Sequence, residues 1–283
     1  MQLKVPSAGR ISPLAGSPDE LLHILETEKE IATKQAALLG LAFQHPHSSQ
    51  LLHALSKLLN HPILDVVALG IIGSQHYNEL LPQVKQIVTA QTSRNPFAIA
   101  AAIRAWSELS TDEDRAELQQ WLMKYLRHHH LGIRVAAARG LAKLGESLGF
   151  EVLEHLLISP VLEDRLLALT HLDGLTEKRV TDLIVKSLQF DFYLKETNER
   201  WRYRYFAIQT LATVHSISRT HWQALQAIAR EWKQESDEGF QSLIRILRHQ
   251  WDKLQQSKKR YDSEVPRKLQ QRLRRVIHIL ENI

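Results

Sequence analysis

The chain has 283 residues, a net charge of +5 and no cysteine. The missing thiols exclude disulfides, cysteine nucleophiles and cysteine-based metal sites, and they suit a reducing cytoplasm. The first twenty residues lack the apolar core of a signal peptide, and the longest apolar stretches are too short to span a bilayer, so we expect a soluble cytoplasmic protein without a membrane partner.

A frame that recurs along residues 19–255 predicts an array of helical repeats, preceded by a flexible Pro-, Gly- and Ser-rich segment at residues 1–18. The clearest copy of the frame is Ile133–Gly145. Six copies begin at Thr33, Leu64, Ala98, Ile133, Asp164 and Tyr203, with starts 31 to 39 residues apart. Their fifth position is always alanine and their ninth is large and apolar, as close helix packing requires.

A second amphipathic helix precedes each copy after the first, and a degenerate seventh copy is expected at Glu238–Trp251. The preceding helices are predicted at Ser49–Asn60, Glu79–Ala90, Asp112–Arg127, Phe150–Ile158, Glu177–Gln189 and His221–Lys233. Residues 256–283 are predicted as a basic linker and a C-terminal capping helix. The prediction is therefore an all-α fold, a right-handed α-solenoid of six to seven helix pairs.

The frame Ile133–Gly145 resembles the HEAT repeat, in particular the bacterial subtype named after the phycobilisome lyases. In that subtype the second position is typically Arg, and here Arg134, Arg165 and Arg204 match it. The early frames depart from it, with Asp65 and Ile99 at this position. The resemblance implies a scaffold fold that serves adaptors, chromophore lyases and nucleic-acid proteins alike.

An aromatic and basic segment, Asn198–Phe206, is the most unusual local sequence. Arginine and aromatic side chains of this kind concentrate at interfaces. Because residues two apart on a helix face different directions, these side chains cannot all share one surface. The residues predicted to bind a partner are Arg134, Arg165, Arg200, Trp201, Arg202 and Tyr205.

Positive charge collects at the C-terminal end of the chain. Residues 245–275 hold eleven Lys or Arg and three acids, so this segment carries +8 and the remainder carries −3. A solvated capping helix explains such a pattern, and a phosphate-binding face is the alternative. That alternative basic face consists of Lys258, Lys259, Arg260, Arg267, Lys268, Arg272, Arg274 and Arg275.

Three functions remain open at this point. The first is a non-catalytic scaffold or adaptor that holds a protein partner in its concave groove. The second, which the repeat subtype implies, is a phycobilin lyase or a chaperone for a bilin-carrying protein, with Arg or His holding the propionates. The third is nucleic-acid binding through the basic face, as in HEAT-like DNA glycosylases.

The sequence contains no motif that is typical of a catalytic, cofactor or metal site. The Gly-x-Ser-x-Gly, phosphate-loop and metalloprotease patterns are missing, so an ordinary enzyme is not expected, and no cofactor is predicted. The histidine clusters at 45–47 and 128–130 lack the spacing of a helical metal site and are predicted to be exposed turn residues. A weak transition-metal site at 128–130 is the alternative.

Overall fold

The computed structural model describes residues 13–90, 95–172, 175, 178–213, 217–258 and 264–283, without the side chains of 178 and 254–270. Every regular element within these ranges is a helix, and they contain no strand. The all-α prediction is therefore confirmed. No helix in these ranges combines the length and the apolar character needed to cross a membrane.

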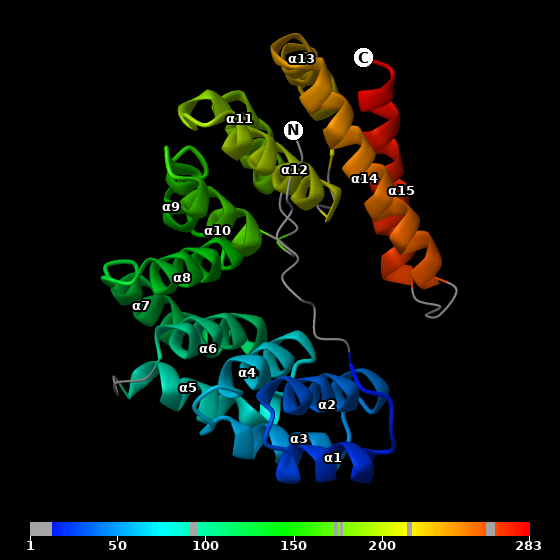
Figure 1. The fold of residues 1–283 in the computed structure, drawn as a ribbon. Helices are drawn as coiled ribbons and strands as arrows, with labels where there is room; N and C mark the ends of the chain where they lie inside the picture. The colour runs from blue at the N-terminus through cyan, green and yellow to red at the C-terminus, as the bar shows by residue number, and fades with distance from the viewer. Residues whose placement is uncertain (1–12, 91–94, 173–174, 176–177, 214–216, 259–263) are drawn as a thin grey trace. The chain divides into compact units, whose positions relative to one another are not determined.

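The helices follow one another through short turns and loops. Within residues 13–150 and within residues 151–283, Figure 1 shows helices lying beside their neighbours in sequence. Their order is α1 (Pro18–Thr27), α2 (Ile31–Gln44), α3 (Ser49–Leu58), α4 (Asp65–Ser74), η1 (Asn78–Leu80), α5 (Leu81–Thr89), α6 (Pro96–Leu109), α7 (Arg115–Tyr125), α8 (Leu131–Lys143), α9 (Ser147–Leu157), α10 (Leu162–Leu172), α11 (Lys178–Gln189), η2 (Asp191–Tyr193), α12 (Thr197–Thr213), α13 (Arg219–Glu235), α14 (Asp237–Lys258) and α15 (Glu264–Glu281).

The recurring frame lies on the even-numbered helices from α2 to α12, and its apolar positions form the core. All six frame alanines are fully buried: Ala37, Ala68, Ala102, Ala137, Ala168 and Ala207. The large residues four positions later are also fully buried: Leu41, Ile72, Trp106, Leu141, Leu172 and Leu211. Because alanine adds only a methyl group, it lets α4 pack closely on α6 and α6 on α8.

The described helices divide into two compact units, one that ends at Phe150 and one from Glu151 to Ile283. The sequence predicts a single array over residues 19–255, and the repeat frame carries no sign of this division. We call the two parts the N-terminal unit and the C-terminal unit.

Residues 13–17 of the predicted flexible segment are packed against α2 in the N-terminal unit. The backbone N–H of Leu14 donates to the carbonyl of Ala36 at 3.0 Å, and Gln44 Nε2 donates to the carbonyl of Leu14 at 2.6 Å. A Cβ atom at Gly40 would lie 2.2 Å from that Leu14 oxygen, so this crossing requires glycine. Residues 1–12 of the predicted segment lie outside the described residues.

Polar links join alternate helices of the N-terminal unit. Glu108 on α6 accepts from Arg139 at 2.7 Å and from Lys143, both on α8. The hydroxyl of Tyr125 on α7 donates to the carbonyl of Val88 on α5 at 2.6 Å. Each bond connects one helix pair with the next pair. These bonds therefore fix how adjacent pairs are aligned, and they also add to the stability of the unit.

In the C-terminal unit, α15 packs against α12, α13 and α14. Its apolar stripe, which consists of Leu273, Val276, Ile277 and Leu280, is buried. A helix that seals the last pair in this way is what the sequence predicts for residues after 256.

Candidate functional site

The aromatic and basic segment of the sequence lies on α12, and the rings of Trp201, Tyr203 and Tyr205 belong to the core. Trp201, Tyr203 and Tyr205 are 2%, 0% and 4% exposed. Gly239 at the start of α14 lies so close to Trp201 that a Cβ atom would come within 2.4 Å of the indole ring. The predicted partner-binding residues Trp201 and Tyr205 therefore face the interior of the C-terminal unit.

Arg204 occupies the centre of this interior. Its guanidinium carbon lies 4.4 Å from the ring centre of Trp201 and 4.9 Å from that of Trp232. Its Nε donates to Asp191 at 2.6 Å, and its Nη2 donates to Glu235. Cation–π stacking and charge-assisted hydrogen bonds both grow stronger away from water, so this cluster stabilises the packing of α12 against η2 and α13.

Three of the predicted partner-binding arginines bind the turn that precedes their own helix. Each donates to the carbonyl six residues earlier: Arg134 to His128 at 3.0 Å, Arg165 to Ser159 at 2.5 Å and Arg200 to Leu194 at 3.3 Å. Arg165 is fully buried and also donates to the carbonyl of Phe190 at 2.9 Å. These three side chains therefore donate hydrogen bonds to backbone carbonyls of the turns. The fourth predicted partner-binding arginine, Arg202, is half-buried.

The described part of the predicted basic face is divided among three environments. Arg272 donates to the carbonyl of Thr213 at 3.0 Å, which ties α15 to the end of α12. The guanidinium of Arg275 lies 5.1 Å from the ring centre of Trp222, while Arg274 is exposed. The side chains of Lys258, Lys259, Arg260, Arg267 and Lys268 lie outside the described residues.

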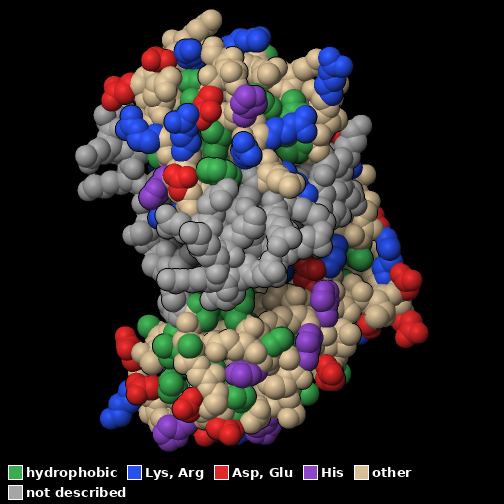
Figure 2. Space-filling view, turned by 90° about the vertical axis from the view of Figure 1, so that its right-hand side faces the viewer, with side chains coloured by type: hydrophobic (Ala, Val, Ile, Leu, Met, Phe, Trp, Pro, Cys, Tyr) green, Lys and Arg blue, Asp and Glu red, His purple; other side chains and the backbone are tan. Residues whose placement is uncertain are grey.

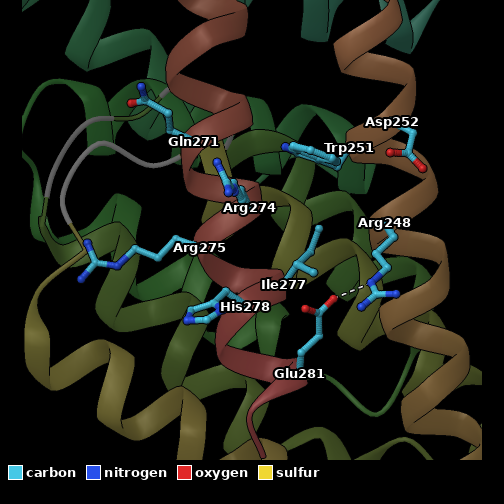
Figure 3. Close-up of a pocket in the computed structure, with 9 residues that line it drawn as sticks. All are labelled: Arg248, Trp251, Asp252, Gln271, Arg274, Arg275, Ile277, His278 and Glu281. Atoms are coloured by element: carbon cyan, nitrogen blue, oxygen red, sulfur yellow. Dashed lines mark hydrogen bonds and ion pairs between the residues drawn. The ribbon is translucent and has the colours of Figure 1, made fainter.

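A groove of about 730 Å³ runs between α14 and α15. Figure 3 shows its walls, with Arg248, Trp251 and Asp252 coming from α14 and the other residues from α15. Its lining consists of Arg248, Trp251, Asp252, Gln271, Arg274, Arg275, Ile277, His278 and Glu281. Its volume falls within the range of pockets that hold small ligands.

The two acids of this groove act on one of its three arginines. Glu281 pairs with Arg248 at 2.5 Å, and the pKa of Arg248 is raised by this hydrogen bond and charge and, further, by the charge of Asp252. Arg274 has no acidic partner among the described residues. The groove therefore presents uncompensated positive charge to solvent.

A second hollow of about 320 Å³ shares the pair of Arg248 and Glu281 with the groove. It adds the cations Lys233 and Arg245, and exposed Arg245 likewise has no acidic partner in the described part of the chain. Figure 2 shows Lys and Arg side chains gathered in the upper part of the view, where the C-terminal helices lie. We call the groove and this hollow together the basic groove.

The histidine cluster at 128–130 makes ring contacts in the N-terminal unit. The rings of His128 and His129 lie 4.2 Å apart between centres, and Phe97 meets His130 edge-on at 5.7 Å. Partial burial, followed by the nearby charges of His129, His130 and Arg134, lowers the pKa of His128. The described residues contain no group of three or more side chains arranged to hold a metal ion.

Several residues of the basic groove were not predicted from the sequence. Arg245, Arg248 and Trp251 lie in the degenerate seventh frame. There the two arginines fit the solvent-facing side of a repeat helix, and Trp251 fits its end. Their spacing of three residues on one helix is the signal that could have found them, because such residues share a face. Lys233 lies on α13 and His278 on α15. They join the basic groove only because α13, α14 and α15 pack together, which the sequence does not show.

Comparisons with known proteins do not add to this assignment: no family model, no curated protein and no solved structure gives a significant match to the chain. The class that fold and site define is an all-helical protein with a basic groove formed by α13, α14 and α15.

Proposed function

We propose that this protein is a right-handed α-solenoid of HEAT-like repeats that binds nucleic acid without catalysing a reaction. It would do so by holding phosphate groups in the basic groove. The observation that carries the proposal is the pair of exposed arginines, Arg245 and Arg274, which line two adjoining hollows and have no acidic partner in the described part of the chain.

Phosphate groups fit this arrangement because guanidinium donors match their oxygens two at a time. A ligand that carries a charge at every unit of its length can contact both hollows at once. Contacts of this kind release counterions, and this release supplies much of the free energy of nucleic-acid binding. The proposal also accounts for the +8 segment in a chain whose remainder is acidic.

The test is a fluorescence anisotropy titration of labelled oligonucleotide with the wild type and with the double variant Arg245→Gln, Arg274→Gln. Both side chains are exposed, so the variant keeps the fold. We expect its dissociation constant to rise about tenfold or more, since charge-assisted hydrogen bonds contribute roughly 1.5–3 kcal/mol each.

The matched control is the double variant Lys29→Gln, Arg127→Gln, which removes the same charge from exposed positions of the N-terminal unit. It should bind almost as the wild type does. Equal weakening by both variants would mean that net charge, and not the basic groove, drives binding. No binding by the wild type would refute the proposal outright.

A protein partner is the second candidate, and a different surface favours it. Phe192 and Tyr193 on η2 are 59% and 46% exposed, and their ring centres lie 4.5 Å apart. Asp191 between Phe190 and this pair is anchored by Arg204, so the rings stand on a fixed support. Exposed aromatic pairs are typical anchors of protein interfaces. The double variant Phe192→Ala, Tyr193→Ala should lose a protein partner that nuclease treatment leaves bound to the wild type.

The alternative of a bilin-carrying partner stays a prediction. A titration with open-chain tetrapyrrole tests it, since binding would shift the absorption spectrum and an unchanged spectrum would count against it.

A further inference from the structure

Trp251 differs from the other tryptophans of the chain in its surroundings. Five tryptophans each have a cation over the ring: Lys85 at Trp106, Lys124 at Trp121, Arg204 at both Trp201 and Trp232, and Arg275 at Trp222. Trp251 has neither a ring nor a cation stacked on it among the described residues, although it is partly exposed in the wall of the basic groove. An indole in this position leaves a flat apolar surface open to a ligand.

Polar side chains that could bind a ligand line the groove beside the indole of Trp251. Figure 3 shows Trp251 reaching from α14 into the space between the two helices, on the side where Arg274 projects from α15. Gln271, one helical turn before Arg274, adds an amide that can donate and accept hydrogen bonds. A ring face, a guanidinium without an acidic partner among the described residues, and an amide therefore line one groove.

We infer that the basic groove binds single-stranded nucleic acid, with one base stacked on Trp251 and the adjoining phosphates on Arg274 and Arg245. This inference rests on the proposed function and names its ligand. Single strands expose the faces of their bases, whereas in a duplex each base is covered by its neighbours, so only the single strand can use the indole. Stacking on an aromatic ring tolerates any base, so we expect little sequence preference.

The experiment compares four probes of about twelve nucleotides, which is within the usual site size of single-strand binders. They are a single strand, the matching duplex, a strand of the same length without bases, and a polyglutamate peptide. Each is titrated against the wild type, Trp251→Ala and Trp251→Phe. The control is Trp121→Phe, which changes a partly exposed tryptophan of the N-terminal unit.

The single strand should bind the wild type most tightly. Trp251→Ala should weaken that binding by about ten- to a hundredfold, because stacking contributes roughly 1–3 kcal/mol per base. Trp251→Phe should retain part of the affinity, and Trp121→Phe should change nothing. The strand without bases should bind more weakly than the intact strand and should not respond to Trp251→Ala.

Other outcomes separate the two proposals. If duplex and single strand bind equally and Trp251→Ala has no effect, the inference is wrong while phosphate binding by the basic groove stands. If the strand without bases binds as well as the intact one, stacking is likewise excluded. If no nucleic acid binds, or if polyglutamate binds more tightly than all of them, both the inference and the proposed function are overturned.

Discussion

Arg204 and Asp191 form an ion pair at 2.6 Å with both side chains almost completely buried, at 2% and 8% exposed. Truncation of one partner leaves the other charge buried without compensation. Arg204→Met should therefore lower the free energy of unfolding by about 3–5 kcal/mol, measured by urea titration. The double variant Arg204→Met, Asp191→Asn should recover part of this loss. A loss that is simply additive would show that the pair is not coupled.

Tyr203 should make the protein sensitive to alkali. Burial, only partly offset by the hydrogen bond to Ser187, raises the pKa of Tyr203 from 10.0 to about 12. A raised folded-state pKa contributes stability that is fully present below pH 10 and is lost as the pH rises through about 12. Tyr203→Phe cannot ionise, so its deficit relative to the wild type should shrink over this range.

The measurement for Tyr203 is urea unfolding of both proteins at neutral pH and in steps up to strong alkali. At neutral pH the variant should be less stable by about 1–2 kcal/mol, because the phenol no longer bonds to Ser187. A difference between the two proteins that stays constant with pH would contradict the assignment.

Glu108 should act at the opposite end of the pH scale. Burial raises its pKa, but the hydrogen bonds and charges of Lys143 and Arg139 outweigh this and hold the pKa below 4.5. A lowered folded-state pKa contributes stability above the unfolded value, and this contribution is lost as the pH falls through the folded value. Glu108→Gln should therefore cost about 2 kcal/mol at neutral pH and progressively less in acid. Parallel stability curves for the two proteins would refute the claim.

Two glycines of the N-terminal unit should respond to alanine in opposite directions. Gly40→Ala should destabilise the protein by about 1–3 kcal/mol, because the added methyl group meets the carbonyl of Leu14. Gly70 lies on exposed α4 surface with no atom within 4 Å of a built Cβ atom. Gly70→Ala should therefore stabilise by about 0.5–1 kcal/mol. Thermal melts of the two variants check both signs.

Much of the secondary structure could be predicted because close helix packing demands a repeated residue type. The alanine at the fifth frame position reports a place where a neighbouring helix leaves no room for a larger side chain, and all six alanines are buried. The division after Phe150 leaves no such mark, since α8 and α10 both follow the frame. The crossing of residues 13–17 over Gly40 also escaped prediction, because the Gly and its partner lie far apart in the sequence.

The candidate site was predicted less well. The segment around Trp201 is rich in arginine and aromatic residues, which are common both at interfaces and in buried cation–π clusters. Only the side-chain packing distinguishes these two environments. The positive charge near the C-terminus was visible in the sequence, but the groove depends on how α14 and α15 pack. Trp251 became informative only when it proved to be the one tryptophan without a stacked cation or ring among the described residues.

The salt dependence of binding tests the central claim most directly. The logarithm of the binding constant for a single strand is measured against the logarithm of salt concentration, for the wild type and for Arg245→Gln, Arg274→Gln. If both arginines contact phosphates, the slope should decrease in magnitude by about 1.4, which is twice the 0.7 expected for each contact with a single strand. An identical slope for the two proteins would show that neither arginine of the basic groove meets a phosphate.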